Sequence, residues 1–440
     1  MSNHTNSEAR QLYTAVEFGT ESIKVLIGMA GDEQNDERPL LIGTGETRSN
    51  PQAGSEVVPR NIRKGEIHDI TKVREQLRVA IEAAQAEAGV SVADGVVVFG
   101  LPQNDMTLTE VRGEQRIAHL SHLVSETDMF KSIREAHIEA VSLADNKDSV
   151  YIQDYTKCFE LDSGRRCYHP IGQPSDCLHT IVEAALCSAP LYAMLSNLVE
   201  EATNVKPQAI FLPMALSAAV LSREERDICN LVIDIGAGLT SFSACLGTCF
   251  LMNHQFKVGC NQIENDIMKA FNLDWSIARH LLRKMPGELQ ASIVNPDDRR
   301  TRMVKVNSRA GRRERQIPIS SLEKVVAARL SEILGMVREK LTAHGIWSLL
   351  DGQVVLTGGA AMIPGIVELA EDILERPVRI GEPLQLNGYR ELLADNPRFL
   401  ATASLLYAGI RAKRVEEAVE AIQAGPMEIA RKILAELFAL

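Results

Sequence analysis

Three short segments, far apart in the chain, each join a predicted apolar strand to a turn of small residues. They are residues 16–20, 232–238 and 355–361. Glycine lets backbone N–H groups approach a phosphate closely, and a carboxylate at a strand end, such as Glu17 or Asp234, can hold a hydrated metal ion. Any one of these turns alone is typical of an ordinary strand-to-helix connection. The ordered set of three predicts one nucleotide held from two sides.

Length and composition are consistent with a multidomain globular protein. At 440 residues the chain is too long for a single core, and two to four domains are predicted. Its net charge of −11 argues against general nucleic-acid binding. The first ten residues are polar, and no run of about 18 apolar residues occurs. The sequence therefore predicts a cytoplasmic protein that does not span a membrane.

The cysteines do not predict a disulfide framework. The chain has 8 cysteines but no CxxC pair, and a chain of this size does not need covalent crosslinks, so reduced thiols are expected. Several cysteines and histidines gather in one region, at Cys158, Cys167, His169, Cys177, His179 and Cys187. Their long spacings differ from those of a zinc knuckle, so buried or surface thiols are favoured over a zinc site. No Ser-His-Asp or Cys-His catalytic set is recognisable, and no catalytic residue is predicted.

Hydrophobic periodicity indicates alternating strands and helices. Strands are predicted near residues 13–16, 24–28, 96–99, 178–186 and 209–212. Helices are predicted near residues 71–88, 126–144, 189–201, 213–221, 261–270, 322–341 and 402–410. The pattern is that of an α/β protein.

The ordered turns resemble those of the actin and heat-shock-70 ATPase superfamily, in which two pseudo-equivalent domains supply two phosphate loops and an adenosine loop. Within that superfamily the chain resembles the FtsA family, which ties the bacterial FtsZ ring to the membrane. The resemblance runs from about residue 13 to residue 409 and is carried by residues 64–67, 152–155, 169–172, 354–365 and 378–384. The PilM pilus-assembly family is the nearest alternative, because residues 19–24 also suit it.

The resemblance implies an actin-like ATPase fold with two pseudo-equivalent halves, an FtsA-type inserted subdomain and a C-terminal amphipathic helix. Subdomain 1A would comprise residues 11–93, 177–212 and 399–412, and subdomain 2A residues 213–270 and 321–398. The inserted subdomain 1C would cover residues 94–176 and the lid subdomain 2B residues 271–320. A linker at 413–426 would precede the final helix, at 427–440.

The resemblance further implies a site for ATP and Mg²⁺, with the metal held through water at Glu17 and Asp234. The implied nucleotide-binding residues are Glu17, Gly19, Thr20, Glu21, Ser22, Asp234, Gly236, Ala237, Gly238, Thr240, Gly259, Gly358, Gly359 and Ala360. Several positions depart from the family pattern. Ala237, Leu239 and Ser241 stand where Gly, Thr and Asp are usual, so weak or absent ATPase activity is expected.

The expected adenosine side departs from the pattern as well. Arg279 and Leu282 stand where Glu and Lys commonly contact the nucleoside. We therefore expect a reduced affinity for the base.

The implied lid contains a basic segment. Its positive residues are Arg299, Arg300, Arg302, Lys305, Arg309, Arg312, Arg313 and Arg315, against the single acid Glu314. Such a segment is either a solvated hairpin or a docking site for an acidic peptide, because clustered arginines attract and grip carboxylates. The resemblance implies that the acidic tail of FtsZ binds there.

Residues 427–440 follow the helix-breaking pair Gly425-Pro426, and their pattern predicts an independent amphipathic helix. Its apolar side carries Ile429, Ile433, Leu434, Leu437, Phe438 and Leu440. At about 21 Å it is shorter than a hydrocarbon layer of about 30 Å, so it would lie on a membrane instead of crossing it. The alternative is a helix that packs on its own domain or on a partner.

Taken with the resemblance, these features predict an adaptor protein. It would bind ATP, polymerise with copies of itself and tether FtsZ to the cytoplasmic face of the inner membrane at the division site. The inserted subdomain would recruit other divisome proteins. The alternatives are a PilM-like scaffold and an ATPase or sugar-kinase-like enzyme, although no catalytic base or sugar cleft is recognisable in the sequence.

Overall fold

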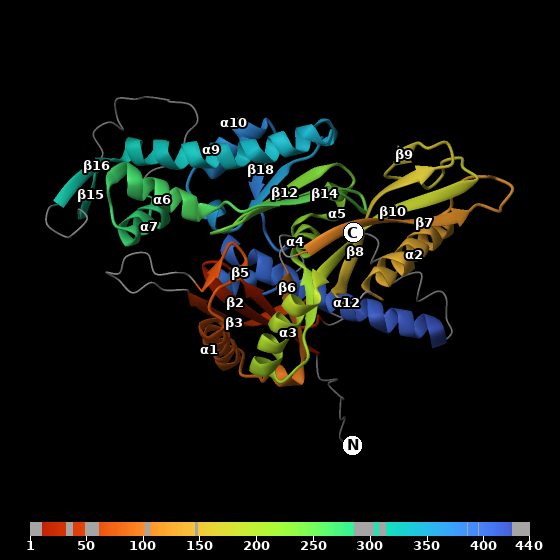
Figure 1. Cartoon of the computed structure of the whole chain (residues 1–440), viewed down its shortest axis with the longest axis horizontal. Helices are drawn as coiled ribbons and strands as arrows, with labels where there is room; N and C mark the ends of the chain where they lie inside the picture. Colours follow the sequence, from red (N-terminus) through yellow and green to blue (C-terminus); the bar gives the residue numbers. More distant parts are fainter. Residues whose placement is uncertain are drawn as a thin grey trace, which may run out of the picture.

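Two five-stranded sheets and a four-stranded sheet organise the chain (Figure 1). The computed structural model describes residues 11–31, 38–48, 61–101, 106–145, 148–285, 303–307, 314–384, 386–394 and 396–424. In Figure 1 the two five-stranded sheets lie one above the other, and the four-stranded sheet extends to one side.

The first sheet has the order β11-β6-β1-β2-β3. Its strands are β1 (Leu12–Phe18), β2 (Ser22–Met29), β3 (Leu40–Arg48), β6 (Val96–Leu101) and β11 (Gln208–Phe211). Both faces are covered: Val16 on β1 packs in the core with α1 (Ile70–Ala88) and α3 (Ala189–Thr203), whereas Ala15 packs in the core with α12 (Leu400–Ala424). Neighbouring side chains on a strand point to opposite faces of the sheet. Because both faces are buried here, β1 is apolar almost throughout.

The second sheet repeats this arrangement, with the order β14-β13-β12-β17-β18. Its strands are β12 (Asn230–Ile235), β13 (Thr240–Leu246), β14 (Cys249–Phe256), β17 (Val354–Thr357) and β18 (Val378–Ile380). In each sheet an antiparallel hairpin, β1–β2 or β12–β13, is followed by a parallel neighbour of its first strand, β6 or β17. The two expected pseudo-equivalent halves are therefore present.

Helices fix the relation between the halves. On β12, Ile233 faces the core that includes α9 (Ile319–Ala343) and α10 (Ile366–Leu374), whereas Val232 faces α4 (Leu212–Val220). Helix α4 also packs against α12, so the helices predicted near residues 213–221 and 402–410 are both formed and lie in contact.

The predicted linker at 413–426 is mostly helical, which corrects the sequence-based expectation. Helix α12 continues to Ala424 without interruption. Residues 413–424 are rich in Ala and Glu, both good helix formers, and the first breaker is Gly425. The predicted membrane helix at 427–440 lies outside the described residues.

The four-stranded inserted sheet has the order β7-β10-β8-β9, with strands β7 (Met106–Arg116), β8 (Ser149–Leu161), β9 (Arg166–Cys167) and β10 (Cys177–Ser188). Helix α2 (Glu126–Ser142) covers one face, starting with a capping box between Ser125 and Asp128. Gly113 permits the close approach of this helix, since a Cβ there would lie 2.3 Å from the Ala136 backbone nitrogen.

The boundaries of the insertion differ from the expected 94–176. Strand β6 pairs in parallel with β1 and so belongs to the first sheet. Strand β10, expected in subdomain 1A, pairs along its whole length with β7 and β8. A buried apolar run identifies a strand but not the sheet that it joins, which explains both corrections.

The described part of the expected lid consists of α7 (Trp275–Arg283) and the hairpin of β15 (Met303–Asn307) and β16 (Glu314–Pro318). It follows α6 (Cys260–Phe271). The remaining short elements include β4 (Ile62–Arg63), β5 (Glu66–Ile67), α5 (Arg223–Arg226), η5 (Gly359–Met362), α11 (Tyr389–Leu393) and η6 (Pro397–Phe399).

None of the eight cysteines forms a disulfide. Among the helices of the described residues, none combines the length and the apolar character needed to cross a bilayer.

Candidate functional site

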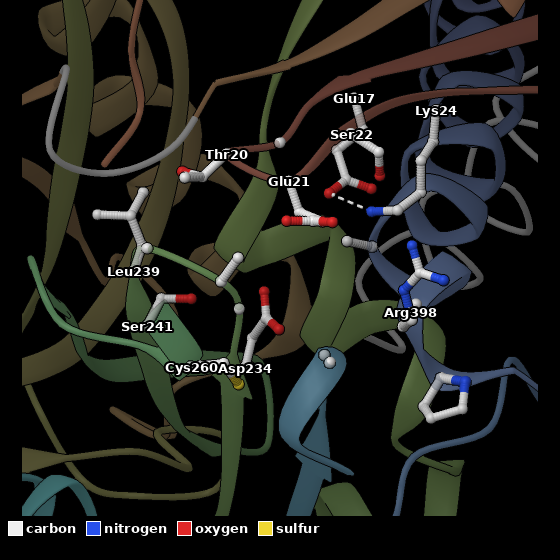
Figure 2. Close-up of a pocket in the computed structure, with 18 of the residues that line it drawn as sticks. Glu17, Thr20, Glu21, Ser22, Lys24, Asp234, Leu239, Ser241, Cys260 and Arg398 are labelled. Carbon is white, nitrogen blue, oxygen red and sulfur yellow. Dashed lines mark hydrogen bonds and ion pairs between the residues drawn. The ribbon is translucent and has the colours of Figure 1, made fainter. Parts of the chain in front are cut away.

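The carboxyl ends of β1 and β12 converge on a cavity of about 360 Å³ between the two halves (Figure 2). All three small-residue turns line it. The predicted site residues in its wall are Glu17, Gly19, Thr20, Glu21, Ser22, Asp234, Gly236, Ala237, Gly238, Gly358 and Gly359. Thus segments more than a hundred residues apart form one site.

The first loop, residues 19–22, is a tight turn between β1 and β2. The Gly19 N–H donates to the Ser22 carbonyl across 3.1 Å, and Phe18 pairs with Ile23 at the base of the hairpin. A Cβ at Gly19 would lie 2.7 Å from that same Ser22 oxygen, so the turn requires glycine. Thr20 and Glu21 stand at the tip and face the cavity (Figure 2).

The second loop, residues 236–239, has the same construction. The Gly236 N–H donates to the Leu239 carbonyl across 2.9 Å, and Ile235 pairs with Thr240. Ala237 does not have a positive φ, so the replacement of glycine there causes no backbone strain.

Three predicted site residues lie behind the cavity wall, in supporting positions. The N-terminus of α6 abuts the second loop, and a Cβ at Gly259 would lie 2.5 Å from the Gly236 carbonyl oxygen. The Thr240 hydroxyl donates to the Val258 carbonyl across 2.9 Å, which ties β13 to the same segment. Ala360 is fully buried under the third turn.

The third turn begins at the end of β17, next to Asp234. Asp234 pairs with Thr357 across the parallel β12–β17 ladder. Gly358 follows with φ +83°, and a Cβ on it would lie 2.2 Å from the Asp234 carboxylate. Only glycine fits at this position, both for its dihedral angle and for the lack of space. Leu282, Met362 and Ile363 provide an apolar wall nearby.

The two predicted metal-contacting carboxylates have different surroundings. Glu17 forms an ion pair with Lys24 at 2.9 Å (Figure 2). It also accepts a hydrogen bond from the Thr402 hydroxyl. For Asp234, burial and the negative charge of Glu17 raise the pKa to about 7, with partial opposition from Lys24. A divalent cation at this end of the cavity would offset the charge that now disfavours ionised Asp234.

Four basic side chains in the cavity wall were not among the sequence-predicted site residues: Lys24, Arg48, Arg283 and Arg398. Burial alone would raise the pKa of Glu46, but Arg398 and Arg48 outweigh it and hold that pKa below its usual range. Lys24 could have been found from sequence, because a tight turn after Phe18 places it opposite Glu17 on β2. Arg398 reaches the site only through tertiary structure.

A chain of ionic contacts crosses the cavity mouth. Glu21 of the first loop forms ion pairs with Arg279 and Arg283 of α7. The Arg279 guanidinium also stacks over the Trp275 ring, 4.5 Å from its centroid. Buried Glu264 lies below and accepts a hydrogen bond from the Trp275 indole across 2.8 Å. Arg279, which stands where Glu is common in the family, therefore joins the lid to the first loop through its ion pair with Glu21.

The predicted partner-binding and membrane residues are only partly described. Lys305 on β15 and Arg315 on β16 are exposed, and Arg315 donates to the Phe271 carbonyl across 3.2 Å. The other predicted basic residues, Arg299, Arg300, Arg302, Arg312 and Arg313, lie outside the described residues. The predicted membrane residues Ile429, Ile433, Leu434, Leu437, Phe438 and Leu440 do so too.

Sequence comparison gives a consistent set of relatives. The model of the family described as cell division protein FtsA matches residues 231–404. The cell division protein FtsA of Neisseria meningitidis is 26% identical over 410 residues, which cover 92% of each chain. That of Escherichia coli K12 is 25% identical over 411 residues, covering 91% of this chain and 90% of the relative.

Solved structures show the same fold. A PilM–PilN type IV pilus biogenesis complex aligns with a TM-score of 0.58 at 16% identity, over 91% of this chain and 99% of that one. MreB5 of Spiroplasma citri bound to AMPPNP aligns with a TM-score of 0.54 at 14% identity, over 93% and 98%. At these identities the likeness concerns the fold alone. Together, these comparisons show that the chain is a homologue of the FtsA cell division proteins along nine-tenths of its length, and that it has an actin-like fold.

Proposed function

We propose that this chain is an ATP-binding, self-assembling adaptor that links the FtsZ ring to the membrane at the division site and recruits further divisome proteins. The observation that carries the proposal is the convergence of all three turns on one cavity between the pseudo-equivalent halves. The full-length similarity to FtsA proteins supports the division role.

The cavity has the chemistry that a magnesium nucleotide requires. Lys24, Arg48, Arg283 and Arg398 bring positive charge, and the two tight loops bring backbone N–H groups to the same space. Bound Mg²⁺ would neutralise phosphate charge, held through water at Glu17 and Asp234. MreB5, which shares the fold, was solved with AMPPNP and with ADP.

Turnover is expected to be slow. Leu239 and Ser241 occupy the part of the second loop where a hydroxyl and a carboxylate are usual in the family, and both line the cavity (Figure 2). Without those groups the loop has fewer contacts that position a metal-bound water for attack. Bound nucleotide would then act mainly by holding the two halves in a closed conformation. This role favours an adaptor protein over an enzyme.

The tether requires a partner site and a membrane site at separate places. Exposed Lys305 and Arg315 mark the basic hairpin, where an acidic FtsZ tail would bind by charge attraction. Residues 427–440 would lie on the membrane surface as an amphipathic helix. Because Arg431 and Lys432 are balanced by Glu428 and Glu436, a single copy would bind weakly and a polymer strongly.

Liposome co-sedimentation with ATP, with and without FtsZ, tests this function. The unmodified chain should carry FtsZ into the pellet, and Ile433→Glu with Leu437→Glu should abolish the effect, because two charges would interrupt the apolar side. Replacing Arg312, Arg313 and Arg315 by Glu should keep the chain on liposomes but leave FtsZ in solution. Equal co-sedimentation by all three proteins would contradict the tether. Binding of an inner-membrane pilus-assembly protein instead of FtsZ would favour the PilM-like alternative.

A further inference from the structure

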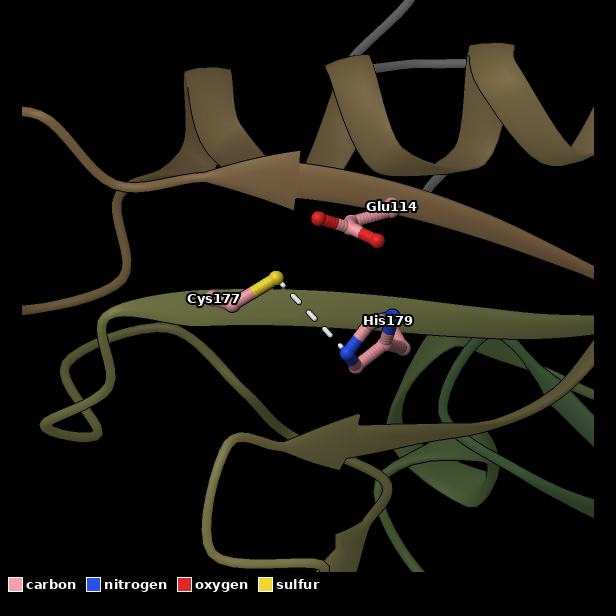
Figure 3. Close-up of side chains that lie close together, drawn as sticks. All are labelled: Glu114, Cys177 and His179. Carbon is pink, nitrogen blue, oxygen red and sulfur yellow. Dashed lines mark hydrogen bonds between the residues drawn. The ribbon is translucent and has the colours of Figure 1, made fainter.

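A second group of potential metal ligands lies far from the nucleotide cavity, on the inserted sheet (Figure 3). Glu114, Cys177 and His179 each offer a ligand atom, and these atoms all lie within 4.8 Å of one another. The Cys177 sulfur is 3.6 Å from Nε2 of His179. The sequence drew attention to Cys177 and His179 but gave no sign of Glu114.

The sheet itself brings these three residues together. Strands β7 and β10 are antiparallel, and their register places Glu114 directly opposite His179. Cys177 precedes His179 by two residues, so both side chains leave β10 on the same face. Directly opposed residues have Cβ atoms roughly 5 Å apart. The backbone hydrogen bonds between β7 and β10 therefore fix the positions of these three residues, and none of them lies on a loop.

This face of the sheet is the one turned away from α2. The neighbouring residue Thr180 points to the helix and hydrogen-bonds Ser132 across 2.7 Å, so His179 must point to the other side. Glu160 of β8 flanks His179 from the opposite strand, but it is engaged by Arg112 and Arg166. Glu114 lies on this face beside the thiol and the imidazole, and its own ion pair, with exposed Arg116, is long at 3.7 Å.

The spacing agrees with coordination of one small ion. Zinc binds cysteine sulfur at about 2.3 Å and histidine nitrogen at about 2.0–2.1 Å in tetrahedral geometry. These bond lengths and a tetrahedral angle place the two donor atoms about 3.6 Å apart, which is the separation seen between Cys177 and His179. Three protein ligands would leave one position for water, as in zinc sites that are not closed.

The chemistry of the donors selects among metals. Magnesium and calcium prefer oxygen ligands only, whereas a thiolate, an imidazole and a carboxylate together suit zinc. In the folded sheet Nε2 of His179 lies 3.6 Å from the Cys177 thiol, which hydrogen-bonds weakly, so zinc would give this nitrogen a stronger partner.

We propose that Glu114, Cys177 and His179 form a zinc site that fastens β7 to β10 in the inserted sheet. Zinc would bind the sulfur of Cys177, Nε2 of neutral His179 and one carboxylate oxygen of Glu114. The thiol proton is released to solvent as the Zn–S bond forms, so that binding strengthens as pH rises. This inference does not depend on the proposed function.

Cobalt substitution of the purified full-length chain tests the site. The chain is first stripped with a chelator and then titrated with Co²⁺ and with Zn²⁺. We expect one ion per chain, a thiolate-to-cobalt charge-transfer band in the near ultraviolet, and loss of that band when Zn²⁺ is added. Zinc should also raise the midpoint of thermal unfolding, since it binds the folded sheet.

Variants separate this site from other ligands. Cys177→Ser should remove the charge-transfer band, and His179→Gln and Glu114→Gln should each weaken Zn²⁺ binding at least tenfold. Cys167→Ser, a partly buried cysteine on β9, and Glu110→Gln, an exposed acid on β7, are the matched controls and should bind as the unmodified chain does. Circular dichroism confirms that each variant folds. Absence of stoichiometric Zn²⁺ binding at micromolar concentration, or an unchanged band in Cys177→Ser, would overturn the proposal.

Discussion

The first and second loops occupy equivalent places in the two halves but neutralise their carboxylates differently. Each loop is a turn closed by one N–H to carbonyl bond, and each follows a strand with an acid two residues before the glycine. Across the hairpin, Glu17 faces Lys24 whereas Asp234 faces Ser241. The first carboxylate therefore has a cation within the protein, and the second has a hydroxyl.

The two hairpins therefore differ in how their carboxylates are stabilised. The Glu17–Lys24 pair is largely buried and is fixed further by Thr402 of α12, so it stabilises the junction of strand and interdomain helix. Asp234 lies opposite Ser241 instead, and burial and the charge of Glu17 raise its pKa to about 7, so a bound cation would favour its charged form. The first hairpin is therefore stabilised by an ion pair within the protein, whereas the second would gain charge stabilisation from the metal that we propose.

The largest expected effect comes from removing the internal cation. Lys24→Met would leave Glu17 without its ion pair in a largely buried position, and breaking such a pair typically costs about 3–5 kcal/mol. Urea unfolding would measure the loss. Ser241→Ala, the equivalent change in the second half, should cost about 1 kcal/mol or less. Equal losses of unfolding free energy in Lys24→Met and Ser241→Ala would show that the two hairpins do not differ in how their carboxylates are stabilised.

The next effect concerns Asp234 and pH, in the absence of nucleotide and metal. Because its folded pKa is raised to about 7, ionised Asp234 destabilises the fold progressively as pH rises from about 4 to 7. Asp234→Asn should remove this pH dependence of stability and make the chain more stable above pH 7. The gain in the free energy of unfolding is at most about 1.36 kcal/mol for each unit by which the pKa of Asp234 is raised. Thermal unfolding from pH 5 to 8 is the measurement. A parallel pH profile for the variant and the parent would contradict the raised pKa.

A smaller loss of stability is expected at the third turn, together with a loss of function. Gly358→Ala forces a Cβ into the space of the Asp234 carboxylate at a positive φ, where strain is about 1–3 kcal/mol. ATP binding should also fall, because the carboxylate is displaced. Gly335→Ala in α9 is the control, since a Cβ there meets nothing within 4 Å and Gly335 is not among the residues that line the cavity. Similar ATP affinity in the two variants would show that this turn does not form the site.

The smallest effect tests the contact between the first loop and the lid. Glu21→Gln removes the ion pairs to Arg279 and Arg283, and we expect severalfold faster nucleotide dissociation with little change in stability. Glu66→Gln is the control, because Glu66 pairs with Lys257 at 2.7 Å in an exposed position. Stopped-flow release of a fluorescent nucleotide would compare them. Unchanged rates in Glu21→Gln would mean that the lid does not close on this loop.

The sequence predicted β1, β2 and β12 and the turns that follow β1 and β12, because buried strands are apolar and each turn needs glycine, but it did not predict β13. It did not predict which sheet β10 joins, since any apolar strand could pair with several partners. Arg48, Arg283 and Arg398 could not be assigned to the cavity, because folding alone brings them to the first loop. The contact of Arg279 with Glu21 was missed for the same reason, since nothing local relates α7 to the first loop.

Isothermal titration calorimetry of the unmodified chain with ATP, with and without Mg²⁺, most directly tests whether the two halves hold one metal nucleotide. We expect one ATP per chain with Mg²⁺ and markedly weaker binding without it, because Asp234 then lacks its cation. Asp234→Asn should bind ATP with little dependence on Mg²⁺. No binding at millimolar ATP with Mg²⁺, or the same affinity in the absence of the metal, would contradict the proposed site.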